Sequence, residues 1–290
     1  MTSALLLVLA RAALAADSCP VLPPDDIGPH ATHIVLFNGM WTSFADARAD
    51  MDALRTNYGN EGPNGEHLRY ALLYHQSSAR KAYRDLVETF DALLGDEQEG
   101  ALAGRFELLP SAIHCGGPWW DAIVDAMPTF QTFLWRDVTP EMQAATESDM
   151  EELLDTPPTI DDFECAREQL EDWDRDNLLL VGHSEGDLFA RVLQDFLEST
   201  DRGGAVASLH IAPATAPPKD EPYLLADIDF LINRIVGASR DVPAVNIEAT
   251  KSPNELHECL GHDLGDVYLT DFELNRAVHD SLEEIVGSMP

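Results

Sequence analysis

Residues 177–199 read NLLLVGHSEGDLFARVLQDFLES, and this stretch decides the fold. It opens with a nearly continuous apolar run, Leu178–Val181, which is typical of a strand buried on both faces of a parallel sheet. Apolar residues then recur at helical spacing from Leu188 to Leu197, which predicts an amphipathic helix. The stretch therefore predicts a strand, a sharp turn that reads Gly-His-Ser-Glu-Gly, and a helix.

A Gly-x-Ser-x-Gly at such a turn has the pattern of a nucleophile elbow. The turn holds the serine in a strained backbone conformation, and a larger residue at either glycine would collide with the adjoining strand or helix. The helix N-terminus brings free N–H groups and a positive dipole end beside a developing oxyanion. Ser184 is therefore the expected nucleophile. His183 is not the expected base, because neighbouring residues in a tight turn cannot easily aim their side chains at each other.

The composition indicates one large acidic domain, or one domain with an insertion. The 290 residues are 45% hydrophobic, which is ample for a core. Acidic residues number 52 against 18 basic ones, which gives a net charge of −34. Such a surface repels phosphates and anionic lipids, so no nucleic-acid partner is expected. The charge indicates either adaptation to high salt, where screening relieves self-repulsion, or only a need for solubility. The composition does not decide between these two interpretations.

Residues 1–16 resemble a signal peptide, with a short apolar run and small residues at Ala13 and Ala15. This reading predicts an exported protein. Arg11 interrupts the run and no basic residue precedes it, so an amphipathic N-terminal helix is the alternative. The run is too short for a permanent membrane anchor, and no later segment is long enough.

The four cysteines show no metal-binding spacing, so neither a metal nor another cofactor is expected. They are Cys19, Cys115, Cys165 and Cys259. In an exported protein they would form two disulfides with three possible connectivities, and in a cytosolic one they would be buried thiols.

Strands and helices alternate along the chain, which predicts an α/β domain over residues 17–290 with a doubly wound, mostly parallel sheet. Further strands are expected at 33–37, 69–74, 205–211 and 242–247, and helices at 44–56, 79–94 and 227–236. Thr270 and Glu273 have the spacing of a capping box for a final helix.

Residues 110–175 break this alternation with helical segments, prolines and aromatic residues, among them Trp119, Trp120, Phe130, Phe133 and Trp135. A helical insertion here would lie over the carboxyl ends of the strands as a lid that lines an apolar pocket. Alternatively, the aromatic residues only hold these helices onto the sheet.

A serine nucleophile needs a histidine base and an acid that orients the base. The histidines after Ser184 are His210, His257, His262 and His279. The first falls in a predicted strand and the last in the final helix, so both are expected to pack or to face solvent. His257 and His262 share a glycine-containing loop, and His262 is favoured because glycines on both sides free its backbone.

The acid should lie between the serine and the histidine in the chain. Asp229 follows the strand after the elbow helix, and Asp227 lies two residues before it. If the acid followed the last strand, Glu248 or Glu255 would be the candidate.

Three segments carry a resemblance to exported bacterial α/β-hydrolases of the lipase/esterase type. They are VGHSEGDLF at 181–189, YLLADIDFLIN at 223–233 and GHDLGDVYL at 261–269. The similarity extends over most of residues 32–284. It implies an α/β-hydrolase fold and a catalytic triad of Ser184, Asp229 and His262.

The resemblance also places an oxyanion loop at residues 38–40, so the N–H groups of Met40 and Glu185 would bind the oxyanion. Glu185 and Asp187 differ from the family's Gln and Asn. Negative charge at these positions would raise the pKa of the base or weaken oxyanion binding.

These expectations combine into a serine hydrolase that cleaves a small-molecule or lipid carboxylic ester through an acyl-enzyme. An acyltransferase or thioesterase with the same triad is one alternative. A non-catalytic binding protein on the same scaffold is another, because Glu185 adjoins the nucleophile.

Overall fold

The computed structural model describes residues 31–39, 42–75, 158, 173–238, 240–252, 255–256, 258 and 260–290. The predicted signal peptide, the helix at 79–94 and nearly all of the insertion at 110–175 lie outside these residues, as do the four cysteines.

The described strands form one five-stranded sheet in the order β2-β1-β3-β4-β5, and every neighbouring pair is parallel. Their bounds are Ala31–Phe37 (β1), His67–Leu73 (β2), Asn177–His183 (β3), Val206–Ile211 (β4) and Tyr223–Leu224 (β5). The prediction of an α/β domain with a parallel sheet is confirmed.

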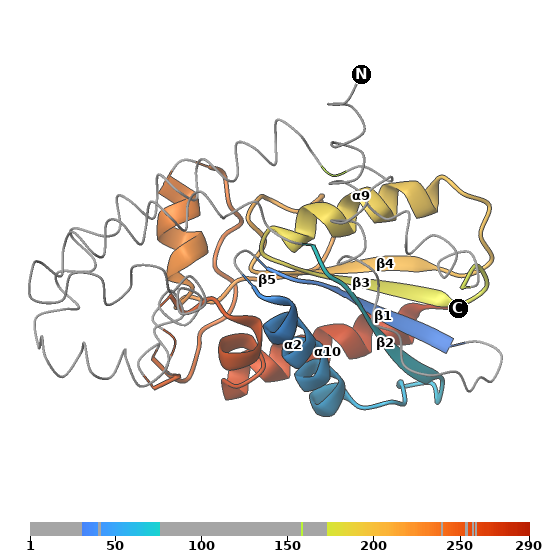
Figure 1. Ribbon diagram of the computed structural model, residues 1–290, viewed down its shortest axis with the longest axis horizontal. Coiled ribbons are helices and arrows are strands. Elements are labelled where there is room, and N and C mark those ends of the chain that lie inside the picture. Colours follow the sequence, from blue (N-terminus) through green and yellow to red (C-terminus); the bar gives the residue numbers. More distant parts are fainter. Residues whose placement is uncertain are drawn as a thin grey trace, which may run out of the picture.

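Helices cover both faces of the sheet (Figure 1). Helix α9 (Gly186–Glu198) lies on one face, whereas α2 (Phe44–Tyr58) and α10 (Phe272–Ser288) lie on the other. Alternate residues of β3 therefore face different cores. Leu178 and Leu180 belong to the cluster under α9, and Leu179 and Val181 to the opposite one. This double burial explains the unbroken apolar run of β3.

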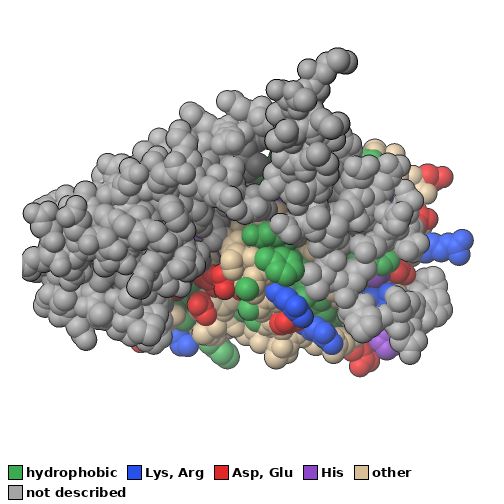
Figure 2. Space-filling model, in the orientation of Figure 1, with side chains coloured by type: hydrophobic (Ala, Val, Ile, Leu, Met, Phe, Trp, Pro, Cys, Tyr) green, Lys and Arg blue, Asp and Glu red, His purple; other side chains and the backbone are tan. Residues whose placement is uncertain are grey.

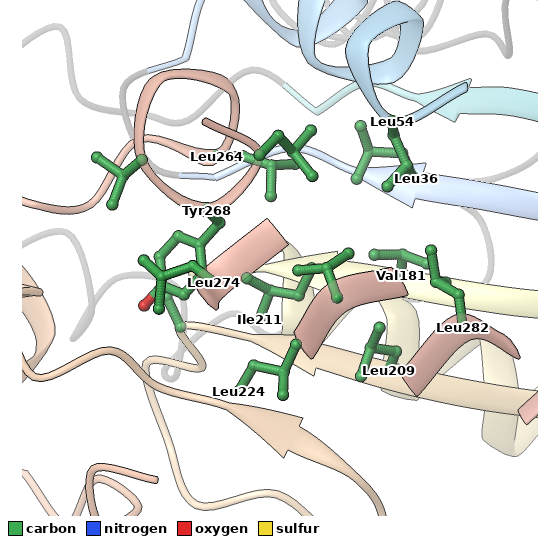
Figure 3. Close-up of a cluster of buried hydrophobic side chains, with 14 of the residues drawn as sticks. Leu36, Leu54, Val181, Leu209, Ile211, Leu224, Leu264, Tyr268, Leu274 and Leu282 are labelled. Atoms are coloured by element: carbon green, nitrogen blue, oxygen red, sulfur yellow. The ribbon is translucent and has the colours of Figure 1, made fainter. Parts of the chain in front are cut away.

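The larger core joins distant parts of the chain. Figure 3 shows side chains from α2, the strands, α10 and the π-helical turn η6 (Leu264–Tyr268) meeting in one cluster. Tyr268 and Leu264 of η6 are fully or almost fully buried there. This burial anchors the segment directly after His262 to the sheet.

The strand order changes direction beside β1. The chain passes from β1 to β2 on one side and later returns to β3 on the other. In parallel α/β sheets, ligands bind outside the carboxyl ends of the strands at such a switch point. The residues that follow β1 and β3 are therefore the first place to look for a site.

The predicted strand at 242–247 is wrong. Only Ile247 pairs with the sheet, in an isolated parallel bridge to Ala226. Within the described structure, backbone bonds from this segment to the chain after β5 are confined to Asn246 and Ile247, whose N–H groups both donate to Leu225 O. The side chain of Asn246 adds two contacts, because it accepts from Leu225 N at 2.8 Å and donates to Tyr223 O at 2.7 Å. The short strand β5 lies directly beside these contacts and was not predicted.

Two helix starts also differ from the prediction. The segment expected at 227–236 becomes helical only at Leu231–Ile235 (η4), followed by Val236–Ala238 (η5). The final helix is capped by Asp271 rather than Thr270, because Asp271 Oδ1 accepts from Glu273 N at 3.0 Å. The Thr270 hydroxyl donates to Gly265 O instead.

Among the described residues, no helix combines the length and the apolar character that crossing a bilayer requires.

Candidate functional site

Ser184 lies at the junction of β3 and α9 with a backbone φ of 56°. This left-handed conformation is unusual for a residue other than glycine. The Ser184 N–H donates to Ile211 O at 3.0 Å, which ties the turn to the end of β4. The Ser184 side chain is completely buried.

The two flanking glycines are required by close backbone approach. A Cβ on Gly186 would lie 2.4 Å from Asn38 O, and a Cβ on Gly182 would lie 2.6 Å from Asp187 Cα. Real Cβ atoms do not approach backbone atoms so closely. The Gly-x-Ser-x-Gly spacing thus allows the turn to pack against the end of β1.

The amide groups at the start of α9 face this junction. The Asp187 N–H donates to Ser184 O at 3.3 Å and the Leu188 N–H to Glu185 O at 3.0 Å. The Glu185 side chain makes no capping bond to the helix. Among the residues that the structure describes, the Glu185 N–H has no backbone acceptor, as is usual for an amide at a helix N-terminus. Such amides can bind anionic groups. Met40, the other predicted oxyanion donor, lies outside the described residues.

The ring of His262 is paired with Asp229. His262 Nδ1 lies 2.9 Å from Asp229 Oδ2, and the two side chains are 5% and 0% exposed. A carboxylate only accepts, so Nδ1 carries a proton, and in the neutral ring Nε2 is left as an acceptor. Gly261 allows the approach, because its φ is 61° and a Cβ there would lie 2.0 Å from Ile228 O.

Asp229 is held by two further donors. Its Oδ1 accepts from Ile232 N at 2.9 Å, and its Oδ2 accepts from the Tyr268 hydroxyl at 2.9 Å. The Tyr268 oxygen in turn accepts from Ala226 N at 3.1 Å. The sequence had indicated no role for Tyr268, which reaches the acid from the turn that follows His262.

The other candidate acids do not contact His262 in the described structure. Asp227 is exposed and accepts from Ala249 N, while Glu255 is exposed and accepts from Ser252. Glu248 is exposed as well. His257, the alternative base, lies outside the described residues.

Ser184 and His262 each retain one polar atom without a partner. Both Ser184 Oγ and His262 Nε2 are buried, and neither has a hydrogen bond within the described part of the chain. His183 brings the two residues into one neighbourhood, because its ring stacks on the His262 ring with centroids 4.7 Å apart. Its Nε2 also donates to His262 O at 2.9 Å. Ser184 Oγ and His262 Nε2 therefore make no hydrogen bond to each other in this structure.

The charges around His262 favour its protonated form. Burial disfavours the imidazolium, but the charge and hydrogen bond of Asp229 outweigh burial, with help from Glu258 and Asp263. The pKa of His262 therefore lies above its ordinary value. Glu258 accepts from His262 N at 2.7 Å and from Leu260 N at 3.1 Å, and its complete burial raises its pKa to about 8.

Glu185 and Asp187, the two acidic residues that differ from the family's Gln and Asn, each contact a histidine. Glu185 Oε1 lies 3.0 Å from His75 Nε2. Asp187 contacts His210 and lies 2.7 Å from Arg191. His210 Nε2 also lies 2.6 Å from Glu221, so this strand histidine holds two carboxylates rather than packing as an apolar residue.

A cluster of possible metal ligands in the described structure lies elsewhere. His279, Asp280 and Glu283 converge within 4.8 Å, but all three are exposed on α10. The site around Ser184 itself offers no comparable group of ligands among the described residues.

The candidate site thus consists of a buried serine, an Asp-paired histidine and a helix N-terminus, held at the carboxyl ends of β1, β3 and β4. Its parts come from segments that are far apart in the sequence. Comparisons of this chain with protein-family models, with curated proteins and with solved structures found no match.

Proposed function

We propose that this chain is a serine hydrolase of the α/β-hydrolase type that cleaves carboxylic esters. One observation carries the proposal: an Asp229-His262 pair follows, in the chain order of such enzymes, a serine at positive φ between a parallel strand and a helix. The free Ser184 Oγ and His262 Nε2 are the two atoms between which the first proton transfer of this chemistry occurs.

In the proposed reaction, Ser184 Oγ attacks the acyl carbonyl and His262 Nε2 takes the serine proton. Asp229 holds the ring with Nδ1 protonated and stabilises the imidazolium that forms. The Glu185 N–H, together with that of Met40, donates to the oxyanion of the tetrahedral intermediate. His262 then protonates the leaving alcohol, and water hydrolyses the acyl-enzyme by the reverse sequence of proton transfers.

A fluorophosphonate probe and a short-chain p-nitrophenyl ester test the proposal. The probe is expected to label wild-type protein, and Ser184→Ala should abolish labelling and lower ester turnover by about 10⁴-fold or more. Ser208→Ala is the matched control, because Ser208 is also a buried serine at a strand but binds Gln194. Wild-type protein that neither labels nor hydrolyses the ester would reject the proposal.

A further inference from the structure

His75 links two strand ends through its backbone. It follows β2 directly, and its N–H donates to Asn38 Oδ1 at 2.9 Å. Its carbonyl accepts from Asn38 Nδ2 at 3.0 Å. Asn38 directly follows β1. The position of Asn38 therefore depends on its two hydrogen bonds to His75.

The side chain of His75 reaches the other half of the same site. Its Nε2 lies 3.0 Å from Glu185 Oε1, and the two side chains are only 11% and 5% exposed. The ring also stacks on Phe189 of α9, with centroids 4.1 Å apart and an angle of 22° between the planes. Glu185 is the residue whose N–H forms the other proposed oxyanion donor. One histidine thus contacts both Asn38, after β1, and Glu185, at the start of α9.

The contact between His75 and Glu185 matters for the site because Glu185 carries a buried carboxylate beside Ser184. A buried carboxylate without a donor is unstable, and next to Ser184 it would repel the negative charge that develops on the substrate oxygen. His75 gives the carboxylate a hydrogen-bond donor and turns it away from the helix N-terminus, where no capping bond forms. The Glu185 N–H is left for the oxyanion.

We infer that His75 is a positioning residue for the oxyanion site: it connects Asn38, after β1, to the start of α9 and gives the Glu185 carboxylate a hydrogen-bond donor. This inference rests on the proposed hydrolase function. It predicts that loss of the His75 donor weakens stabilisation of the transition state more than it weakens substrate binding, so that kcat falls while KM changes little.

His75→Phe is the test, because phenylalanine retains the stack on Phe189 and removes only the hydrogen bond. His33→Phe is a closely matched control. His33 Nε2 lies 2.9 Å from Asp176 Oδ2, and the ring stacks on Trp173 at 3.9 Å and 22°, but this pair lies at the opposite ends of the strands. Both variants lose a buried histidine-carboxylate contact, and only one adjoins Ser184.

With the p-nitrophenyl ester, His75→Phe is expected to lower kcat by about 10- to 100-fold with KM within about threefold of wild type. His33→Phe should leave kcat within about twofold. Adding Glu185→Gln to His75→Phe should restore most of the lost kcat, since the unpaired charge is then removed. Circular dichroism at the assay temperature checks that each variant is folded.

A kcat for His75→Phe equal to that of His33→Phe would overturn the inference, and so would a double variant no faster than His75→Phe. If His75→Phe does not fold, the double variant is compared with Glu185→Gln alone. Similar kcat values are expected, because the carboxylate that needs the His75 donor is absent from both, and a double variant slower by about tenfold or more would overturn the inference. These outcomes presuppose that the wild-type protein labels with fluorophosphonate. A wild-type protein that does not label rejects the hydrolase itself, and the role of His75 with it.

Discussion

At the scale of single residues, the described site is organised around one carboxylate oxygen. Asp229 Oδ2 accepts hydrogen bonds from His262 Nδ1 and from the Tyr268 hydroxyl, each at 2.9 Å, and Asp229 is fully buried. Two donors on one oxygen restrict where the His262 ring can lie. The same charge opposes the effect of burial on His262 and raises its pKa.

The raised pKa predicts the pH dependence of ester hydrolysis. His262 acts as a base only when neutral, so kcat/KM should rise with pH through a midpoint above the ordinary histidine value of 6.5. Asp229→Asn should move this midpoint to lower pH and reduce kcat/KM by about 10⁴-fold. Asp227→Asn, at an exposed carboxylate two residues away, should change neither. A midpoint below 6.5 in the wild-type protein would contradict the assignment.

Glu258 predicts a second effect of pH, on stability. Burial raises its pKa from 4.5 to about 8, so the folded state binds this proton more tightly than the unfolded state. Its contribution to stability is fully present below about pH 4.5 and is lost as pH rises to about 8, on the order of 5 kcal/mol in total.

Glu258→Gln should therefore match wild-type stability near pH 5 and exceed it near pH 9, because glutamine resembles the neutral acid. Urea unfolding at the two pH values measures this difference. Glu283→Gln, on the exposed side of α10, serves as the control and should show no such divergence. Parallel stability curves for Glu258→Gln and wild type would refute the prediction.

At the scale of elements, side-chain caps and close contacts decide where helices begin. The start of α10 depends on Asp271, which is fully buried. Its Oδ1 accepts from two N–H groups of the first helical turn, and its Oδ2 accepts from Thr250 and from Lys251 N. One carboxylate thus joins the last helix to Thr250 and Lys251, which follow the segment of the expected strand.

Asp271→Ala is expected to destabilise the protein by about 2 kcal/mol, since it removes a helix cap and leaves several partly buried donors without an acceptor. Asp280→Ala, in the exposed body of the same helix, should cost less than about 0.5 kcal/mol. Urea midpoints at pH 7 compare the two variants. Equal midpoints would show that the cap is dispensable.

At the scale of the whole molecule, the net charge of −34 opposes the compact state. Figure 2 shows acidic side chains at several separate places on the described part of one face. Repulsion of this kind acts through solvent and is screened by salt, with a Debye length of about 10 Å at 0.1 M and about 3 Å at 1 M.

The unfolding free energy should therefore rise as sodium chloride increases from about 0.05 to 1 M, the range over which screening strengthens most. Urea unfolding at fixed pH measures it. Sucrose at equal osmolality is the control for stabilisation by an excluded solute without screening. A free energy that stays constant or falls with added chloride would show that repulsion is not a major term.

Local patterns in the sequence were enough for the sheet class and for the turn at Ser184. A strand buried on both faces must be apolar throughout, and a helix with one buried face must repeat its apolar residues every three or four positions. Both signals lie within residues 177–199, so they could be read without knowledge of any distant contact. The strand predicted at 242–247 was wrong because only its last two residues, Asn246 and Ile247, bond through their backbone to the chain after β5.

Sequence by itself determined that this chain forms a parallel α/β sheet with a glycine-flanked serine between a strand and a helix. Only the tertiary structure decided which of four candidate carboxylates meets His262, and that Glu185 lies against His75, 110 residues earlier in the chain. The physical reason is range: backbone periodicity and turn geometry depend on neighbours in sequence, whereas a buried histidine–carboxylate contact depends on which strand ends the sheet order brings together.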